Sequence, residues 1–180
     1  MSKKGNVWDD LLKPVVVLLC IALAAAALLG FVNSKTEPII KENARIKAEQ
    51  TRAAVLAGAK GFEEIKGDYA VYDIGSIYKE TSGLGYVITS THKGYGGDIL
   101  VTVGLDPDGK IVGISADVKT ETQGVGSKTG EAKYLDKFLG LSGNEAGSSV
   151  DSLTGASYSS NAIKNSVNAI MNAFDKIIKK

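Results

Sequence analysis

The residues best suited to chemistry precede the last helical pattern of the chain, where hydroxyl and small side chains follow one another. Residues 151–160 read DSLTGASYSS, so hydroxyl groups stand on both sides of Gly155 and Ala156 at a predicted helix N-terminus. One interpretation is N-capping, because serine and threonine accept hydrogen bonds from unpaired backbone N–H groups. The other is a phosphate site, since free N–H groups and the helix dipole favour an anion. These residues alone leave both interpretations open.

A second candidate segment is the predicted loop over residues 120–129, TETQGVGSKT, in which polar side chains precede Gly124 and Gly126. Glu121 and Lys128 flank the two glycines. Their side chains either contact a ligand or form a solvated pair, and the sequence favours neither.

Composition excludes several other kinds of site. The 180 residues include one cysteine and one histidine, which excludes an intrachain disulfide, a Cys/His zinc cluster and any site that needs two imidazoles. The formal net charge is +1 and there is no basic block, so a nucleic-acid partner is not expected. The histidine, His92, is expected at the surface and is assigned no role.

Short strands and helices must position the two candidate segments. Four runs rich in Val, Ile, Tyr and Thr between residues 68 and 118 predict strands, and the DPDG sequence between the last two predicts a hairpin over residues 98–118. A short helix is expected near residues 130–139. The last helix has one apolar face, formed by Ile163, Val167, Ile170, Phe174 and Ile177. These elements predict an α+β fold, an antiparallel sheet packed by helices.

Residues 14–32 form an apolar run without a charged side chain, and as a helix its 19 residues would rise about 28 Å against a hydrocarbon core of roughly 30 Å. The run exceeds the apolar region of a signal peptide, about 7 to 15 residues, so we predict an uncleaved anchor. Lysines are denser before it than after it, which places the N-terminus in the cytoplasm. The expected organisation is a cytoplasmic N-terminus (1–13), a transmembrane helix (14–32), a stalk helix (33–62) and an extracytoplasmic domain (63–180).

The hydroxyl-rich segment resembles a known signature. Thr154 to Ser159, TGASYS, preceded by Asp151, is similar to the S/T-G-A-T/S-x-T/S signature of FMN-binding domains in the Rnf and Nqr electron-transport complexes. In that family a flavin transferase esterifies the FMN phosphate onto the last hydroxyl residue, which corresponds to Ser159. The usual residue there is threonine. Ser157 and Ser160 are the alternative attachment residues.

Other segments extend the resemblance over about residues 94 to 178. Residues 94–99 (GYGGDI) and 109–114 (GKIVGI) are similar to the family's G-Y-x-G-x-I and G-x-I-x-G-I patterns. Residues 121–126 (ETQGVG) are similar to its E-T-P-G-L-G loop, which lies beside the flavin. Gln123 replaces the usual proline, and Lys119 stands where histidine is common.

The resemblance implies one covalent FMN per chain, without a catalytic residue or a metal ligand. The implied FMN-binding residues are Tyr95, Glu121, Thr122, Gly124, Val125, Gly126, Thr154, Gly155, Ala156, Ser157 and Ser159. It implies an electron-carrying subunit of a complex that couples electron transfer between ferredoxin and NAD to cation movement. Its partners would be other membrane and iron–sulfur subunits and a maturing flavin transferase. The short chain favours the Rnf lineage over Nqr.

Two other functions are compatible with the residues. The first is a membrane-anchored binding or sensor domain of the same fold without flavin, in which the hydroxyl cluster only caps a helix. The second is a stand-alone extracytoplasmic reductase, which would need a substrate pocket and an electron donor of its own.

Overall fold

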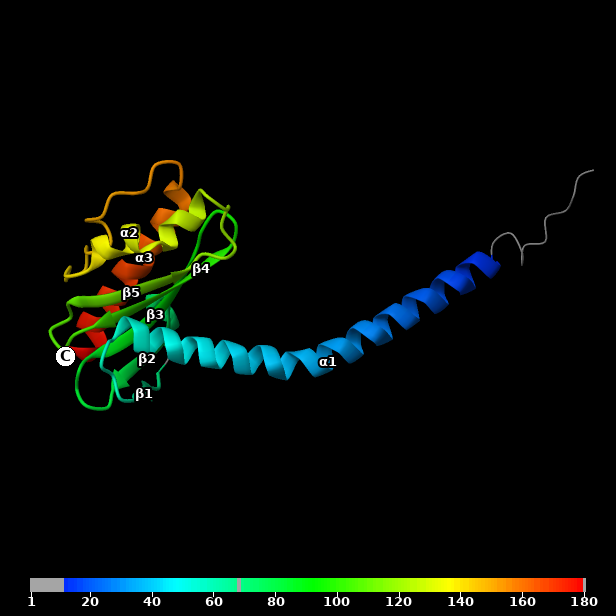
Figure 1. Ribbon diagram of the computed structural model, residues 1–180, viewed down its shortest axis with the longest axis horizontal. Helices are drawn as coiled ribbons and strands as arrows, with labels where there is room; N and C mark the ends of the chain where they lie inside the picture. Colours follow the sequence, from blue (N-terminus) through cyan, green and yellow to red (C-terminus); the bar gives the residue numbers. More distant parts are fainter. Residues whose placement is uncertain (1–11, 68, 180) are drawn as a thin grey trace, which may run out of the picture. The chain divides into compact units, whose positions relative to one another are not determined.

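A computed structural model describes residues 12–67 and 69–179 (Figure 1). The predicted cytoplasmic N-terminus, residues 1–13, lies almost entirely outside these described residues. The chain divides into two compact units, one that ends at Lys47 and one that begins at Ala48. The second unit contains the sheet and the candidate segments.

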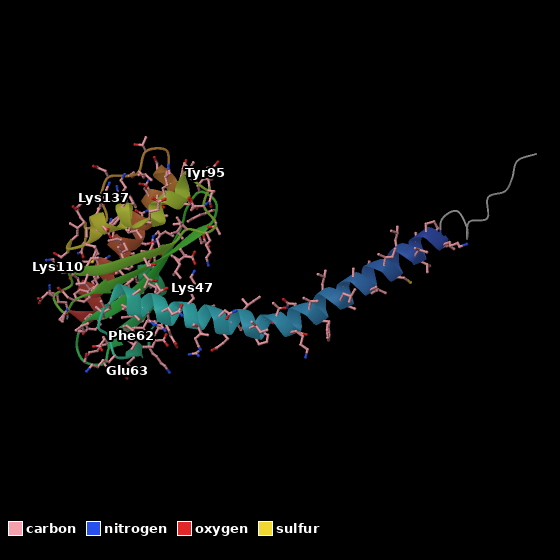
Figure 2. The ribbon with its side chains drawn as sticks, viewed as in Figure 1. Lys47, Phe62, Glu63, Tyr95, Lys110 and Lys137 are labelled. Carbon is pink, nitrogen blue, oxygen red and sulfur yellow. The ribbon has the colours of Figure 1, made fainter. Side chains whose placement is uncertain are left out.

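The first element is the long helix α1, Lys13–Val55, which contains the predicted membrane segment. Its N-terminal part is long and apolar enough to cross a membrane. The apolar side chains of this part are exposed rather than buried in protein, and Figure 2 shows them projecting on all sides of the helix. Pro38 lies within the helix without ending it. The helix ends at Val55, before the predicted stalk end at residue 62, and the boundaries of the membrane and stalk segments stay predictions.

The sheet has five strands: β1 (Phe62–Ile65), β2 (Ile74–Glu80), β3 (Tyr86–Lys93), β4 (Asp98–Leu105) and β5 (Ile111–Asp117). Each strand pairs antiparallel with the next, in the order β1-β2-β3-β4-β5. The predicted α+β class is therefore confirmed. Strand β1 was not predicted, because its sequence FEEI has no apolar run. The first of the four predicted strands between residues 68 and 118 begins at Ile74, since Ala70–Tyr72 forms a 3-10 helix.

The predicted hairpin over residues 98–118 is confirmed as β4 and β5. Its turn is closed by Asp106, whose Oδ1 accepts hydrogen bonds from the backbone N–H groups of Asp108 (3.0 Å) and Lys110 (2.8 Å). Gly109 adopts φ 86°, a left-handed conformation that glycine takes without strain. Figure 2 shows Lys110 at this turn and Tyr95 at the opposite end of the sheet.

One face of the sheet is covered by α3 (Ser157–Ala173), in which Ile163, Val167 and Ile170 of the predicted apolar face are buried. Phe174 and Ile177, the other two residues of that face, lie in the π-helical turn Phe174–Ile178 that follows, where Phe174 is buried and Ile177 is partly buried. The predicted short helix is present as α2 (Ala132–Leu135), followed by the 3-10 turn Asp136–Phe138. His92 is half-buried rather than at the surface, and its Nδ1 lies 3.0 Å from the Ser166 hydroxyl of α3.

The opposite face receives the end of α1. Val55 and Leu56 are buried there against Val87 of β3. Gly104 of β4 pairs with Gly113 of β5, and a Cβ atom on either residue would overlap the Val55 carbonyl oxygen. The two glycines therefore let the end of α1 touch the backbone of the sheet.

We expect Gly104→Ala to destabilise the domain by about 1–3 kcal/mol, because the added methyl group must displace the end of α1. Urea unfolding of the full chain in detergent would measure the change. Gly30→Ala is the matched control, since apart from its own helical turn no atom of the described residues lies within 4 Å of its Cβ position. Equal unfolding midpoints for Gly104→Ala and the wild type would show that α1 does not press on the sheet at this point.

Glu80 is a buried carboxylate at the end of β2. It accepts hydrogen bonds from the backbone N–H groups of Leu84 (3.0 Å), Lys60 (3.0 Å) and Ser82 (2.7 Å), and from the Ser82 hydroxyl (2.7 Å). The Leu84 and Lys60 N–H groups contribute most to lowering the pKa of Glu80 from 4.5 to about 2. One ionised side chain thus fastens the β2–β3 turn to the segment before β1.

The lowered pKa predicts an acid-dependent loss of stability. Between about pH 4.5 and about pH 2 the unfolded chain binds a proton at Glu80 that the folded chain does not bind, so the free energy of unfolding falls as the pH falls through this window. Glu80→Gln removes this titration. Unfolding measured at several pH values should therefore show a shallower acid decline for the variant than for the wild type. Equal declines in the free energy of unfolding of the two proteins would contradict the lowered pKa of Glu80.

Candidate functional site

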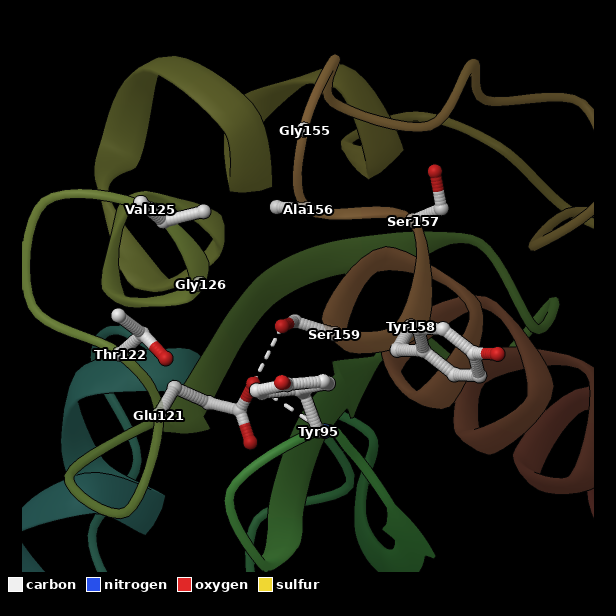
Figure 3. Close-up of a pocket in the computed structure, with 10 residues that line it drawn as sticks. All are labelled: Tyr95, Glu121, Thr122, Val125, Gly126, Gly155, Ala156, Ser157, Tyr158 and Ser159. Carbon is white, nitrogen blue, oxygen red and sulfur yellow. Dashed lines mark hydrogen bonds between the residues drawn. The ribbon is translucent and has the colours of Figure 1, made fainter.

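Three segments that are distant in sequence meet at one pocket of about 340 Å³. They are the β3–β4 turn, the loop after β5 and the first turn of α3, and Figure 3 shows their side chains around a common space. The lining residues are Tyr95, Glu121, Thr122, Val125, Gly126, Gly155, Ala156, Ser157, Tyr158 and Ser159.

The β3–β4 turn carries an exposed aromatic ring to the mouth of the pocket. The turn is closed by a hydrogen bond from the Gly94 N–H to the Gly97 carbonyl (2.8 Å). Tyr95 lies at its tip with 72% of its surface exposed, and Tyr158 at the start of α3 is 70% exposed. The two ring centroids are 6.1 Å apart with planes at 47°. An aromatic pair thus borders the pocket on its solvent side.

Glu121 holds the three segments together from inside. Its side chain is buried, and it accepts hydrogen bonds from the backbone N–H groups of Gly96 (2.9 Å) and Tyr95 (3.3 Å). Its Oε2 also accepts a short hydrogen bond from the Ser159 hydroxyl. Burial by itself raises the pKa of Glu121, but the hydrogen bonds from Ser159, Gly96 and Tyr95 together outweigh it and lower the pKa below its usual value. The carboxyl group is therefore ionised at neutral pH.

The loop after β5 brings its backbone close to this contact. A Cβ atom on Gly126 would lie 2.7 Å from both Glu121 Oε2 and Ser159 Oγ, so only glycine leaves the two oxygens undisturbed. The loop is braced by a hydrogen bond from the Gly124 N–H to the Ser127 hydroxyl (2.9 Å). Gly124 therefore shapes the loop without lining the pocket.

The hydroxyl residues before and within α3 have different surroundings. The N-cap residue is Ala156, and no side chain caps this end of the helix, so the capping interpretation is wrong at that position. Ser160 is buried, and its hydroxyl accepts a hydrogen bond from the Leu153 N–H (2.9 Å). Ser157 is exposed, whereas Ser159 is buried at the inner wall of the pocket. The first backbone N–H groups of α3 are thus left without a side-chain cap beside the pocket.

The structure brings most of the predicted site residues together around the pocket, although their roles stay predictions. Thr154 and Gly124 are the two predicted residues that do not line it, and Lys128 is exposed and also lies outside the lining. Sequence reasoning missed Tyr158. Its position in the sequence could have indicated it, because Tyr158 lies between two serines in the first turn of a predicted helix. A side chain there lies close to any ligand bound at the helix N-terminus.

The arrangement suits a ligand with an anionic end and a planar ring. Uncapped N–H groups and the positive end of the α3 dipole favour an anion at the inner end. The tyrosine pair offers aromatic faces at the outer end. Small-molecule pockets measure about 300–1,000 Å³, so this one is large enough to enclose part of such a ligand while the ring stays near the surface.

Comparison with known proteins relates the pocket region to one family. Residues 94–172 match the family model described as FMN-binding domain. This part of the chain is therefore similar to FMN-binding domains. All three pocket segments lie within the matched region, so the uncapped start of α3 and the exposed tyrosines fit the phosphate and the ring of FMN.

Relatives of the whole chain are known as well. The G subunit of the Na(+)-translocating ferredoxin:NAD(+) oxidoreductase complex of Acetobacterium woodii is 26% identical and aligns with 96% of this chain and 95% of its own length. The G subunit of the ion-translocating oxidoreductase complex of Methanosarcina acetivorans is 29% identical, over 93% of this chain and 95% of its own. The G subunit of the proton-translocating ferredoxin:NAD(+) oxidoreductase complex of Clostridium ljungdahlii is 26% identical over 57% of this chain and 54% of its own. The match to the first two includes the N-terminal helix.

We expect the Tyr158 ring to contribute to FMN affinity by stacking. In a Ser159→Ala background, which removes the Ser159 hydroxyl, Tyr158→Leu should weaken FMN binding about two- to twelve-fold, the equivalent of 0.5–1.5 kcal/mol for an aromatic pair. Titration of the full chain with FMN would measure it. Tyr158→Phe keeps the ring and serves as the control. Equal affinity for the Leu and Phe variants would exclude a contact between ring and flavin.

Proposed function

We propose that this chain is the covalently flavinylated, electron-transferring G subunit of an Rnf-type ion-translocating ferredoxin:NAD oxidoreductase complex. The FMN-binding domain and the nearly full-length relatives, both G subunits of such complexes by name, support this function. The attachment residue is Ser159, through a phosphoester. The observation that carries this assignment is the position of the Ser159 hydroxyl at the inner wall of the pocket, beside the uncapped start of α3.

The residues around the pocket indicate what the protein contributes and what FMN contributes. FMN supplies the redox chemistry, and the protein supplies binding and position. The start of α3 binds the phosphate, and Ser159 prevents loss of a small cofactor to a large extracytoplasmic volume. Tyr95 and Tyr158 hold the ring near the surface, where electron exchange with a partner requires it. Electron transfer itself needs no acid or base from the chain.

The membrane arrangement belongs to the same proposal. The apolar part of α1 anchors the chain. The excess of lysines before it over those directly after it supports a cytoplasmic N-terminus and an FMN-binding domain outside. One membrane helix cannot form an ion path, so other membrane and iron–sulfur subunits supply that path and the electron relay. A flavin transferase attaches the FMN. The Rnf lineage is favoured over Nqr by the names of the relatives.

The test is intact mass with peptide mapping of the full chain, co-expressed with a flavin transferase. We expect the wild type to gain one FMN less the water lost on esterification, on the peptide that contains Ser159. Ser159→Ala should gain nothing, because among the described residues no other hydroxyl lies at the inner wall of the pocket with a carboxylate beside it. Ser157→Ala removes an exposed hydroxyl from the same turn and should load like the wild type. If Ser159→Ala still gains the mass of FMN, the attachment residue is another hydroxyl. If neither the wild type nor any variant gains mass, the flavin-free domain is favoured.

A further inference from the structure

We propose that Glu121 is a catalytic residue for the attachment of FMN: its carboxylate takes the proton from Ser159 Oγ as that oxygen bonds to phosphorus. The chain thus supplies the base for its own modification. This inference rests on the proposed function and goes beyond it, because it assigns a chemical role to a residue expected only to contact the flavin.

The geometry meets the first requirement of a general base, contact with the proton it removes. Ser159 Oγ donates its hydrogen bond to Glu121 Oε2. Ser159 is 1% exposed and Glu121 is 6% exposed, so water does not compete for this proton. Among the described residues that line the pocket, Glu121 is the one carboxylate. A serine hydroxyl is a weak nucleophile until a neighbouring base accepts its proton.

The surrounding backbone keeps the base in position. The Gly96 N–H donates to Oε1 and the Tyr95 N–H donates to Oε2, so both carboxylate oxygens are held from the β3–β4 turn. These hydrogen bonds keep the carboxyl group ionised before the reaction. The other titratable side chains that line the pocket are Tyr95 and Tyr158, which lie at its exposed mouth.

The step balances with a flavin pyrophosphate, such as flavin adenine dinucleotide, as the FMN donor. The Ser159 Oγ–H bond breaks and the proton goes to Glu121. The Ser159 Oγ–P bond forms, the bridging P–O bond of the pyrophosphate breaks, and a nucleoside monophosphate leaves with the electron pair of that bond. Nothing is oxidised or reduced. The transferase binds the donor, and this chain provides the nucleophile and its base.

The product explains why the proton stays on Glu121. The new phosphodiester carries one negative charge a few ångströms from the carboxyl group, and two adjacent anions out of water repel each other strongly. A protonated Glu121 instead donates a hydrogen bond to the phosphodiester. The site has one negative charge before attachment, on the carboxylate, and one afterwards, on the phosphodiester. Attachment therefore adds no net charge to this buried site.

The experiment measures the rate at which FMN joins the purified full chain in detergent, by intact mass, with a flavin transferase and flavin adenine dinucleotide. Glu121→Gln keeps the shape and can still accept from the Gly96 N–H, but it cannot take a proton. We expect it to load about 10²- to 10⁴-fold more slowly, the usual contribution of a general base. Glu63→Gln, an exposed residue on β1 labelled in Figure 2, is the matched control and should load at the wild-type rate.

The pH dependence separates a base from a structural support. Without Glu121, the Ser159 hydroxyl can lose its proton only to hydroxide, so the rate of the variant should rise about tenfold per pH unit. The ratio of the wild-type rate to the Glu121→Gln rate should therefore fall about tenfold per pH unit across about pH 6 to 8. Titration of the transferase affects both rates equally and cancels in the ratio. A structural role predicts a constant ratio. If thermal unfolding shows that Glu121→Gln does not fold, Gly126→Ala takes its place. That variant keeps the carboxylate but puts a methyl group 2.7 Å from both oxygens, and it should also load slowly.

The outcomes distinguish the two proposals. Slow loading of Glu121→Gln with a falling rate ratio supports the catalytic role. Loading of Glu121→Gln at the wild-type rate, or a slow rate with a constant ratio, overturns the role of Glu121 and leaves the proposed function intact. A wild-type chain that takes up no FMN overturns the covalent function itself.

Discussion

The buried carboxylate of Glu121 is the interaction on which the pocket depends. It receives two backbone hydrogen bonds from the β3–β4 turn and one from Ser159 of α3, while its own backbone belongs to the loop after β5. Hydrogen bonds to charged groups contribute about 1.5–3 kcal/mol each. Three segments that the sheet alone would leave independent are therefore held at one point, and the pocket lies above that point.

Glu80 and Glu121 are two buried carboxylates that hold backbone turns in place in the same way. Each is a buried carboxylate that accepts backbone N–H groups from a turn, and each has a lowered pKa. Glu80, however, accepts from the Lys60, Ser82 and Leu84 N–H groups and from the Ser82 hydroxyl, all in neighbouring turns, and it does not line the pocket at Ser159. Both carboxylates accept from a serine hydroxyl, but only Glu121 and its donor Ser159 line this pocket. The same physical solution is structural in one place and available for chemistry in the other.

Much of the fold could be predicted because its signals are local. The β4–β5 hairpin follows from the DPDG turn between two alternating apolar runs, and the buried face of α3 follows from helical spacing of Ile163, Val167 and Ile170. Strand β1 could not be predicted, since FEEI becomes a strand only by pairing with β2. The half-burial of His92 was missed for a similar reason, because its partner Ser166 is 74 residues away.

The site was predictable as a set of segments but not as a geometry. The motif resemblance predicted that Glu121 and Ser159 lie near a flavin, yet their direct contact with each other depends on Gly126, whose missing side chain leaves room for both oxygens. Sequence spacing alone also could not tell which of the three serines contacts Glu121. In the structure Ser157 is exposed, the Ser160 hydroxyl accepts from the Leu153 N–H, and the Ser159 hydroxyl donates to Glu121. Only the fold distinguishes these three chemically identical side chains.

The pocket divides into a buried anchor and an exposed end, and this division suits an electron carrier. Attachment chemistry needs a dry environment, because water would compete for the serine proton and weaken every charge interaction nearby. Electron exchange needs the opposite, a ring that a partner can approach. Ser159 and Glu121 are almost completely buried, whereas Tyr95 and Tyr158 at the mouth are more than two-thirds exposed. Because Tyr158 and Ser159 are adjacent in the chain, the proposed attachment would fix one cofactor at its phosphate and leave its ring accessible.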